Sequence, residues 1–238
     1  MTIIDKGPSL RCQIASSADE VLACQKLRHQ CFWGAAGIDQ DCFDAKSEHL
    51  MLVDNAGELQ GTLRYRIVDA KADWHGTYSG ARYDIDPLPQ RAIEIGRFCA
   101  KDCAQQAQVL RVAMAHLTRL VDEQEVKFLV GCASFAGIDP APYRKVLKLL
   151  NSDHLLANPF KVGKKHNRLN TLDLEGEVGD QLQLPIPMLL KSYLALGGRV
   201  SDHAVVDHEL NTFHVLVVVD VDDIPPARAK ALRALAAI

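Results

Sequence analysis

The chain has 238 residues, 48% of them hydrophobic and 24% charged, so it can bury a core and is not disordered as a whole. Its 27 basic and 30 acidic side chains give a net charge of −3, and aromatic residues scarcely interleave with the basic ones, which argues against nucleic acid as a partner. No apolar run reaches the roughly 18 residues of a membrane span, and the first ten residues lack the basic and then apolar order of a secretion signal, so a cytoplasmic protein is expected.

The N-terminal two thirds of the chain predict alternating strands and helices. Capping residues at 16–20 begin a helix that runs to about Phe32, and the turn sequence 54–57 separates two apolar runs that predict a hairpin. Residues 69–90, with their glycines and prolines, are expected to form a long irregular loop that is functional or mobile. Strands are expected at 10–15, 49–53, 59–68, 92–100 and 128–132, and helices at 16–32, 110–121 and 140–150.

The C-terminal third adds three predicted elements. An apolar stretch at 189–196 ends at two glycines and predicts a helix. The run 213–221 is nearly all valine and leucine and predicts a central strand, and 225–237 predicts a surface helix that begins with proline. The order of elements indicates an α/β (α+β) fold in which helices flank both faces of a mixed sheet.

The sequence contains no internal repeat and no long linker, so one domain over 1–238 is expected. A core would span 10–155, and 156–238 would be a basic loop followed by an extension that completes the sheet. Residues 140–170 carry seven basic side chains and one acidic one. Such a block suits an acidic partner, and the alternative is a solvated helix face followed by a loop.

The stretch from Glu94 to Phe98 lies inside a predicted strand and contains Gly96. A strand glycine often marks a bulge or a place where a ligand approaches the backbone. A carboxylate such as Glu94 beside that opening can accept a proton from an amine, while backbone N–H groups near Gly96 and Arg97 hold an oxyanion. The alternative is an ordinary ion pair between Glu94 and Arg97.

A set of spaced charged and aromatic residues resembles the signature of acyl-homoserine-lactone synthases and their relatives, whose fold is similar to the Gcn5-related N-acetyltransferases. The residues are Arg28, Phe32, Asp41, Asp44, Arg64, Glu94 and Arg97. Three later blocks, 131–140, 189–194 and 205–212, resemble the bacterial ornithine N-acyltransferases that make lyso-ornithine lipid. The resemblance covers roughly residues 10–222.

The resemblance implies an enzyme that moves a 3-hydroxyacyl chain from acyl carrier protein to the α-amine of an amino acid, classically ornithine. It implies no bound cofactor, because the acyl-phosphopantetheine of the carrier protein is the donor. Catalysis would rest on Glu94 as general base, with Gly96 and Arg97 beside it. Substrate binding would involve Arg28, Phe32, Asp41, Asp44, Arg64, Ser134, Phe135, Asp207 and Asn211. For Arg28, Arg64 and Arg97, binding of a phosphate or a carboxylate and structural pairing with Asp41 and Asp44 both stay open, and for the two aspartates we favour pairing.

The absence of glycine from residues 98–109 favours the carrier-protein donor. Coenzyme-A-dependent enzymes of this fold hold the pyrophosphate with a glycine-rich turn at a helix start. A donor tethered to a small acidic protein instead needs a basic docking surface. The candidates for that surface are Arg144, Lys145, Lys148, Lys161, Lys164, Lys165 and Arg168.

Two features depart from the family pattern. His214 stands where an aspartate is common, and 201–204 replaces a more glycine-rich turn. The acceptor could therefore be lysine, glutamine, glycine or a homoserine-lactone-type signal precursor instead of ornithine. Asp202, Asp207 and Glu209 could pair with a cationic acceptor, although solvated acids at strand ends are the favoured interpretation.

Other classes of function are less favoured. His203, His208 and His214 with Asp202 and Asp207 lack the helical spacing of a zinc hydrolase, and the seven cysteines form no CxxC pair and read as reduced thiols, so no metal is expected. Cys132 could form an acyl-enzyme, but a packed thiol is favoured. A non-catalytic module that binds carrier protein is a further alternative. An amphiphilic product also suggests peripheral contact with the inner membrane.

Overall fold

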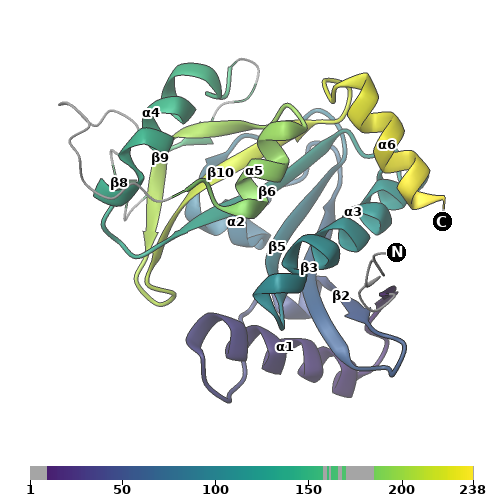
Figure 1. Ribbon diagram of the computed structural model, residues 1–238. Coiled ribbons are helices and arrows are strands. Elements are labelled where there is room, and N and C mark those ends of the chain that lie inside the picture. Colours follow the sequence, from purple (N-terminus) through teal and green to yellow (C-terminus); the bar gives the residue numbers. More distant parts are fainter. Residues whose placement is uncertain (1–9, 158–159, 161, 166–167, 170–184, 238) are drawn as a thin grey trace, which may run out of the picture. The chain divides into compact units, whose positions relative to one another are not determined.

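The computed structural model describes residues 10–157, 160, 162–165, 168–169 and 185–237 (Figure 1). Its internal contacts divide the chain into two compact units. Unit 1 comprises residues 1–66, 95–124 and 231–238, and unit 2 comprises 67–94 and 125–230. Strands β3 and β5 each run from one unit into the other, and the units are described separately below. The expected division into a core and a C-terminal extension stays a prediction.

Unit 1 is a sheet with a helix on each face. Its strands follow the order β1-β2-β3-β5. Cys24 packs against Met51 and Val53 on one face, whereas a Cβ atom at Gly61 would lie 2.3 Å from Val109 of the other helix. The elements are β1 (Arg11–Ile14), α1 (Ala18–Trp33), η1 (Asp44–Lys46), β2 (Glu48–Val53), β3 (Leu59–Val68), β5 (Ala92–Ala100), η3 (Cys103–Gln105) and α3 (Gln106–Glu123).

The start of α1 illustrates how local sequence sets these elements. The Ser17 hydroxyl accepts a hydrogen bond from the Glu20 N–H group, and the Glu20 carboxylate accepts from the Ser17 N–H group. This reciprocal capping box satisfies N–H groups that the first turn leaves without partners. The helix ends at Gly34, whose φ of 67° favours glycine. The predicted helix at 16–32 and the hairpin at 49–68 are confirmed.

Unit 2 contains the larger part of the sheet. Its strands follow the order β5-β6-β10-β9-β8, and a small second sheet pairs β4 with β7. Strand β10 lies between β6 and β9, as predicted for a central strand. The elements are η2 (Trp74–Gly76), α2 (Tyr78–Arg82), β4 (Asp84–Ile85), β6 (Phe128–Ala136), η4 (Ala141–Tyr143), α4 (Arg144–Asp153), β7 (Val162–Gly163), β8 (Arg168–Leu169), α5 (Met188–Ala195), β9 (Arg199–Asp207), β10 (Thr212–Asp220) and α6 (Pro226–Ala236), which continues into unit 1.

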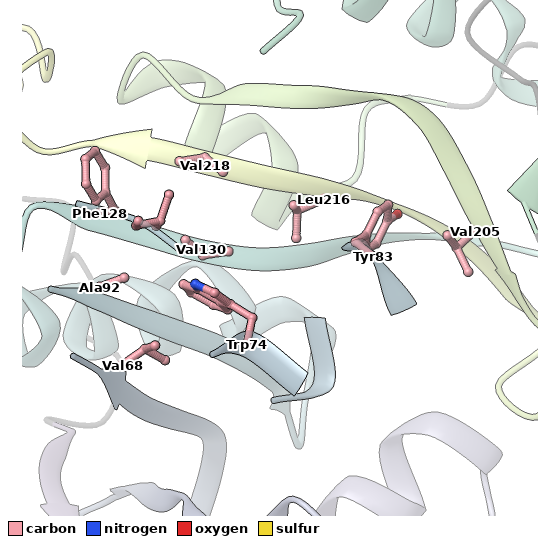
Figure 2. Packing of buried hydrophobic residues seen from close by; sticks show 10 residues of the cluster. Val68, Trp74, Tyr83, Ala92, Phe128, Val130, Val205, Leu216 and Val218 are labelled. Atoms are coloured by element: carbon pink, nitrogen blue, oxygen red, sulfur yellow. The ribbon is translucent and has the colours of Figure 1, made fainter. Parts of the chain in front are cut away.

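One face of the unit 2 sheet carries an apolar layer (Figure 2). Neighbouring strands contribute alternate residues to it, as the two-residue period of a strand requires. The layer contains Val68, Trp74, Tyr83, Leu88, Ala92, Phe128, Val130, Val205, Leu216 and Val218, all buried. Cys132 and Phe160 are among the half-buried residues that pack against it. We call this set the apolar layer.

One expectation about local structure was wrong. Residues 69–90 are not an irregular loop, because the Asp73 and Thr77 side chains cap two short helical segments there. Gly80 allows these segments to pack, since a Cβ atom at this position would lie 1.8 Å from the Trp74 carbonyl oxygen. Residues 201–204 lie inside β9, and the Ser201 hydroxyl accepts a hydrogen bond from the Leu216 N–H group on β10.

Among the helices that the structure describes, none has both the length and the apolar character needed to cross a bilayer.

Candidate functional site

Arg28 lies at the centre of an ion-pair network in unit 1. Its side chain is fully buried. Its guanidinium donates to both oxygens of Asp44, with Nη1–Oδ1 and Nη2–Oδ2 distances of 3.0 and 2.8 Å. Its Nε lies 2.7 Å from Asp39 Oδ2, and its Nη2 also donates to the Asp39 carbonyl oxygen. A bidentate contact of this kind fixes the helix to the segment after it, in distance and in orientation.

Two further arginines complete this network. Arg64 Nη1 lies 2.7 Å from Asp44 Oδ1 and 2.5 Å from Asp41 Oδ1. Arg97 Nη2 lies 3.0 Å from Asp41 Oδ2, and its Nε lies 3.4 Å from Asp39 Oδ2. Three guanidinium charges therefore face three carboxylates. We call these six residues the Arg28 network.

The backbone at Arg97 has the irregularity that the strand glycine suggested. Arg97 has a φ of 54°, in the left-handed region that side chains other than glycine rarely adopt. Gly96 itself has no such φ, and a Cβ atom there would meet nothing within 4 Å. The ion pairs of Arg97 with Asp39 and Asp41 hold this strained backbone in place.

Asp41 and Asp44 of the Arg28 network are poor proton acceptors. Burial alone would raise the pKa of Asp44, but the hydrogen bonds and charges of Arg28 and Arg64 hold it well below its usual range. Burial would also raise the pKa of Asp41, but the hydrogen bond and charge of Arg64, and then the charge of Arg97, lower it below its usual value. Both groups therefore stay charged near neutral pH, as structural ion pairs require.

Glu94 lies in a separate cluster, in unit 2. Its side chain is buried, and its Oε1 accepts a hydrogen bond of 2.6 Å from the Ser79 N–H group. The Cys132 thiol lies 3.8 Å from the Ser79 hydroxyl. Burial, and then the charge of Glu94, raise the pKa of Cys132 well above its usual range. Cys132 therefore stays protonated, which argues against the alternative of an acyl-enzyme.

Asp207 lies in the same unit and is held on both of its oxygens. Oδ2 accepts from the Tyr78 hydroxyl at 2.8 Å and lies 3.8 Å from Arg82 Nη2. Oδ1 accepts from the N–H groups of Glu209 and Leu210. The expectation that Asp207 is a solvated acid was wrong, because its side chain is buried, whereas Asp202 and Glu209 are exposed as expected.

His214 and Tyr83 are buried against each other next to that cluster. The Tyr83 hydroxyl donates to the His214 carbonyl oxygen at 2.7 Å and lies 3.1 Å from His214 Nδ1. Burial lowers the pKa of His214 to about 4, although the charge of Asp207 opposes this. In the described parts of the chain, no three His, Cys, Asp or Glu side chains are placed to hold a metal ion.

We expect His214 to make the stability of the fold depend on pH. In the unfolded chain His214 is protonated near pH 6.5, and in the folded chain only near pH 4. The contribution of neutral His214 to the free energy of unfolding is therefore complete above about pH 6.5 and is lost as the pH falls towards 4. The free energy of unfolding should fall by roughly 3 kcal/mol over this interval. Asp207, Arg82, Tyr78 and Tyr83 face the ring.

Urea unfolding at pH 7 and pH 5 checks this, with His214→Asn as the comparison. The variant should lose less stability than the wild type on acidification. Equal losses in the two proteins would show that His214 is not the group responsible.

The remaining predicted substrate-binding residues differ in how deeply they are buried. Phe32 is half-buried near the end of α1, and Ser134 is exposed on β6. Phe135 is fully buried and stacks on Phe213 with 4.7 Å between ring centroids. Asn211 is exposed in the turn after β9, and its carbonyl oxygen accepts from the Gly137 N–H group. Contacts of these residues with a substrate stay predictions.

The predicted docking residues lie partly on α4. Val146, Leu147 and Leu150 bury one side of this helix, and it also carries Arg144, Lys145 and Lys148, of which Lys145 is the exposed one. Lys164 is exposed, whereas Lys165 is half-buried and donates to the Gly80 carbonyl oxygen at 2.5 Å. Lys161 and the side chain of Arg168 lie outside the described part of the chain.

Sequence reasoning missed Tyr78, Ser79 and Arg82. All three lie in the segment that was read as an irregular loop. The Thr77 hydroxyl caps α2, and a Thr-Tyr-Ser-Gly run before a strand is the signal that could have indicated a short helix there.

The chain is similar to known N-acyltransferases in sequence. Residues 24–115 match the acetyltransferase (GNAT) domain family. The chain is 29% identical to an L-ornithine N(alpha)-acyltransferase of Rhodobacter capsulatus, over 89% of this chain and 90% of that protein. It is 26% identical to an L-ornithine N(alpha)-acyltransferase of Brucella abortus, over 93% of this chain and 88% of that protein.

Solved structures share the fold at low sequence identity. FeeM, an N-acyl amino acid synthase from uncultured soil microbes, aligns with a TM-score of 0.50 and 12% identity, over 97% of this chain and 98% of its own. The CoA-dependent acyl-homoserine lactone synthase BjaI aligns with a TM-score of 0.51 and 12% identity, over 98% of this chain and 90% of its own. The predicted fold class and the resemblance drawn from the sequence are confirmed.

Proposed function

We propose that this chain, an N-acyltransferase with the Gcn5-related N-acetyltransferase fold, transfers a 3-hydroxyacyl group from acyl carrier protein to the α-amine of L-ornithine. The names of its sequence relatives support an amino acid as acceptor and ornithine as the first candidate. The observation that carries the proposal is the buried Glu94 carboxylate, which receives one hydrogen bond from Ser79 and has a second oxygen for a substrate proton.

Glu94 acts as general base. The acceptor arrives as an ammonium and must lose a proton, directly or through one water, before its nitrogen can attack the thioester carbon. A C–N bond then forms, the C–S bond breaks, and the pantetheine thiolate leaves and takes up a proton. The predicted role of the Gly96 and Arg97 N–H groups is to hold the oxyanion of the intermediate.

Acyl carrier protein is the proposed donor, and α4 is its proposed docking surface. The helix carries three basic residues within five positions, and the partner is acidic, so complementary charge speeds encounter. BjaI, which shares the fold, is described as CoA-dependent. The assay below therefore compares acyl carrier protein with coenzyme A as the acyl donor.

Charge reversal on α4 should weaken use of the carrier protein. We expect Lys145→Glu together with Lys148→Glu to raise KM for the acyl carrier protein by about tenfold and to leave kcat within about twofold. Lys230→Glu, an exposed basic residue on α6, is the matched control. An unchanged KM in the double variant would place the docking surface elsewhere.

Asp207 is the proposed partner of a cationic acceptor side chain. It is charged, because the Leu210 N–H group and the Tyr78 hydroxyl lower its pKa against the opposing effect of burial. Ornithine and lysine would each place an ammonium group within reach of such a carboxylate, whereas glutamine and glycine would not.

The test is a free-thiol release assay with purified chain. Acyl carrier protein and coenzyme A thioesters are offered separately, each with ornithine, lysine, glutamine and glycine, and products are identified by mass. Thiol release that needs ornithine and carrier protein, with an acyl amide of the expected mass, supports the proposal in full. Thiol release with another amino acid would correct the proposed acceptor, and release from coenzyme A thioesters would correct the proposed donor. No thiol release under any condition would reject the proposed function.

The proposed location of the protein is the cytoplasm. Peripheral contact with the inner membrane is proposed as well, because the product is an amphiphile that must reach the bilayer. Co-sedimentation with anionic vesicles tests the contact, and a chain that stays in the supernatant would exclude it.

A further inference from the structure

The backbone of α2 holds the proposed base. Glu94 Oε1 accepts from the Ser79 N–H group at 2.6 Å, and both residues are buried. Ser79 is the second residue of α2, so its N–H group has no acceptor inside the helix. A short hydrogen bond from an N–H group to a carboxylate fixes the oxygen in direction as well as in distance. The orientation of Glu94 therefore depends on where α2 places Ser79.

Thr77 determines how α2 begins. Its side chain is 1% exposed, and its hydroxyl accepts from the Gly80 N–H group and donates to the Trp74 carbonyl oxygen, both at 2.9 Å. The Thr77 carbonyl oxygen accepts from the Ala81 N–H group at 3.0 Å, which closes the first turn of the helix. One hydroxyl thus caps α2 and joins it to η2, the helical segment before it.

The helix cannot keep this geometry by its own stability. It has five residues, and isolated helices of that length are not stable in water. The packing at Gly80 leaves no room for adjustment, since a Cβ atom there would lie 1.8 Å from the Trp74 carbonyl oxygen. Ser79 and Gly80 are consecutive, and their N–H groups are bound by Glu94 and Thr77. A change in one of these two hydrogen bonds therefore displaces the other.

We infer that Thr77 is a positioning residue for Glu94: it caps α2 so that the Ser79 N–H group holds one carboxylate oxygen and leaves the other to take the substrate proton. The inference rests on the proposed function, because this position matters to the rate only if Glu94 is the base. Thr77 acts through Ser79 and has no contact of its own with the reacting atoms. A displacement of about 1 Å at a catalytic group can lower the rate by up to about 10²-fold.

The experiment removes the cap in two backgrounds. Thr77→Val loses the hydroxyl and keeps the size of the side chain. In the wild type it should lower kcat by about tenfold and leave KM for acyl carrier protein and for ornithine within about twofold. In Glu94→Gln the same change should lower the residual kcat by less than about twofold, because the base whose position it sets is absent. An equal loss in both backgrounds, or no loss in the wild type, would overturn the inference.

Two further variants separate positioning from loss of stability. Thr77→Ser keeps the hydroxyl and should keep kcat within about twofold. Thr62→Val is the matched control, because Thr62 is fully buried in unit 1 and its hydroxyl donates to the Leu50 carbonyl oxygen at 2.8 Å. It should lose stability in urea unfolding as Thr77→Val does, yet keep kcat within about twofold. A tenfold loss of kcat in Thr62→Val would attribute the effect to stability and overturn the inference.

A second measurement does not depend on turnover. In a ¹⁵N-labelled full chain, the hydrogen bond to the carboxylate moves the Ser79 amide proton signal downfield, and Glu94→Gln identifies that signal by weakening the bond. Thr77→Val should move the Ser79 signal upfield, whereas Thr77→Ser and Thr62→Val should leave it in place. An unmoved signal in Thr77→Val would overturn the inference. A moved signal in a chain whose wild type transfers no acyl group would reject the proposed function while the effect of Thr77 on Glu94 stands.

Discussion

Glu94→Gln should lower kcat for acyl transfer by about 10²- to 10⁴-fold, the range over which a positioned general base contributes. The amide keeps an oxygen that can accept from the Ser79 N–H group, so the local structure is retained, but it cannot take the ammonium proton. Thiol release from acyl carrier protein measures the rate, and carrier-protein binding should be unchanged.

Glu209→Gln serves as the control for that loss, because Glu209 is an exposed carboxylate of the same unit and should retain activity. A Glu94→Gln variant with nearly full activity would mean that another group takes the proton. If neither the wild type nor the variant transfers an acyl group while both bind carrier protein, the chain is a binding module. A lower melting temperature in the variant alone would identify misfolding as the cause of lost activity.

Arg28→Leu should destabilise the fold by about 3–5 kcal/mol, the cost of breaking a buried ion pair from one side. Arg28 is fully buried, and its removal leaves Asp39 and Asp44 with less opposing charge than they face in the wild type. Urea unfolding of the purified variant measures the change.

The exposed pair of Lys127 and Asp222 provides the comparison. Its Nζ–Oδ1 distance is 2.8 Å, yet both side chains are solvated, and Lys127→Met should cost no more than about 1 kcal/mol. Arg28→Leu combined with Asp44→Asn should recover part of the loss, since the double change restores the charge balance. A loss below about 1 kcal/mol for Arg28→Leu would show that the Arg28 network does not hold the fold together.

Local signals in the sequence predict most of the helices and strands. The Ser17 and Glu20 pair predicts the start of α1, and residues 54–57 predict the β2–β3 turn, because capping and turn chemistry act over a few residues. The mispredicted segment, 69–90, is one where close packing decides the structure, as at Gly80 against the Trp74 carbonyl group. The hydrogen bond from the Leu216 N–H group to the Ser201 hydroxyl is likewise a contact between strands that the local sequence does not reveal.

The candidate site was only partly predictable for the same reason. Glu94 stood out because a carboxylate next to a strand glycine is unusual, and Asp41 and Asp44 were expected to form ion pairs. Their partners could not be assigned singly, because Arg28, Arg64 and Arg97 are far apart in sequence and meet only in the fold.

The chain passes between its two units four times, so both are assembled from separate stretches of sequence. No single truncation therefore yields an intact unit, and the matched span 24–115 contains only part of each. A protease cut at one crossing would leave the fragments held together by their remaining contacts. Biochemical dissection of this enzyme should accordingly rely on point substitutions in the full chain, since isolated fragments would report on damaged units.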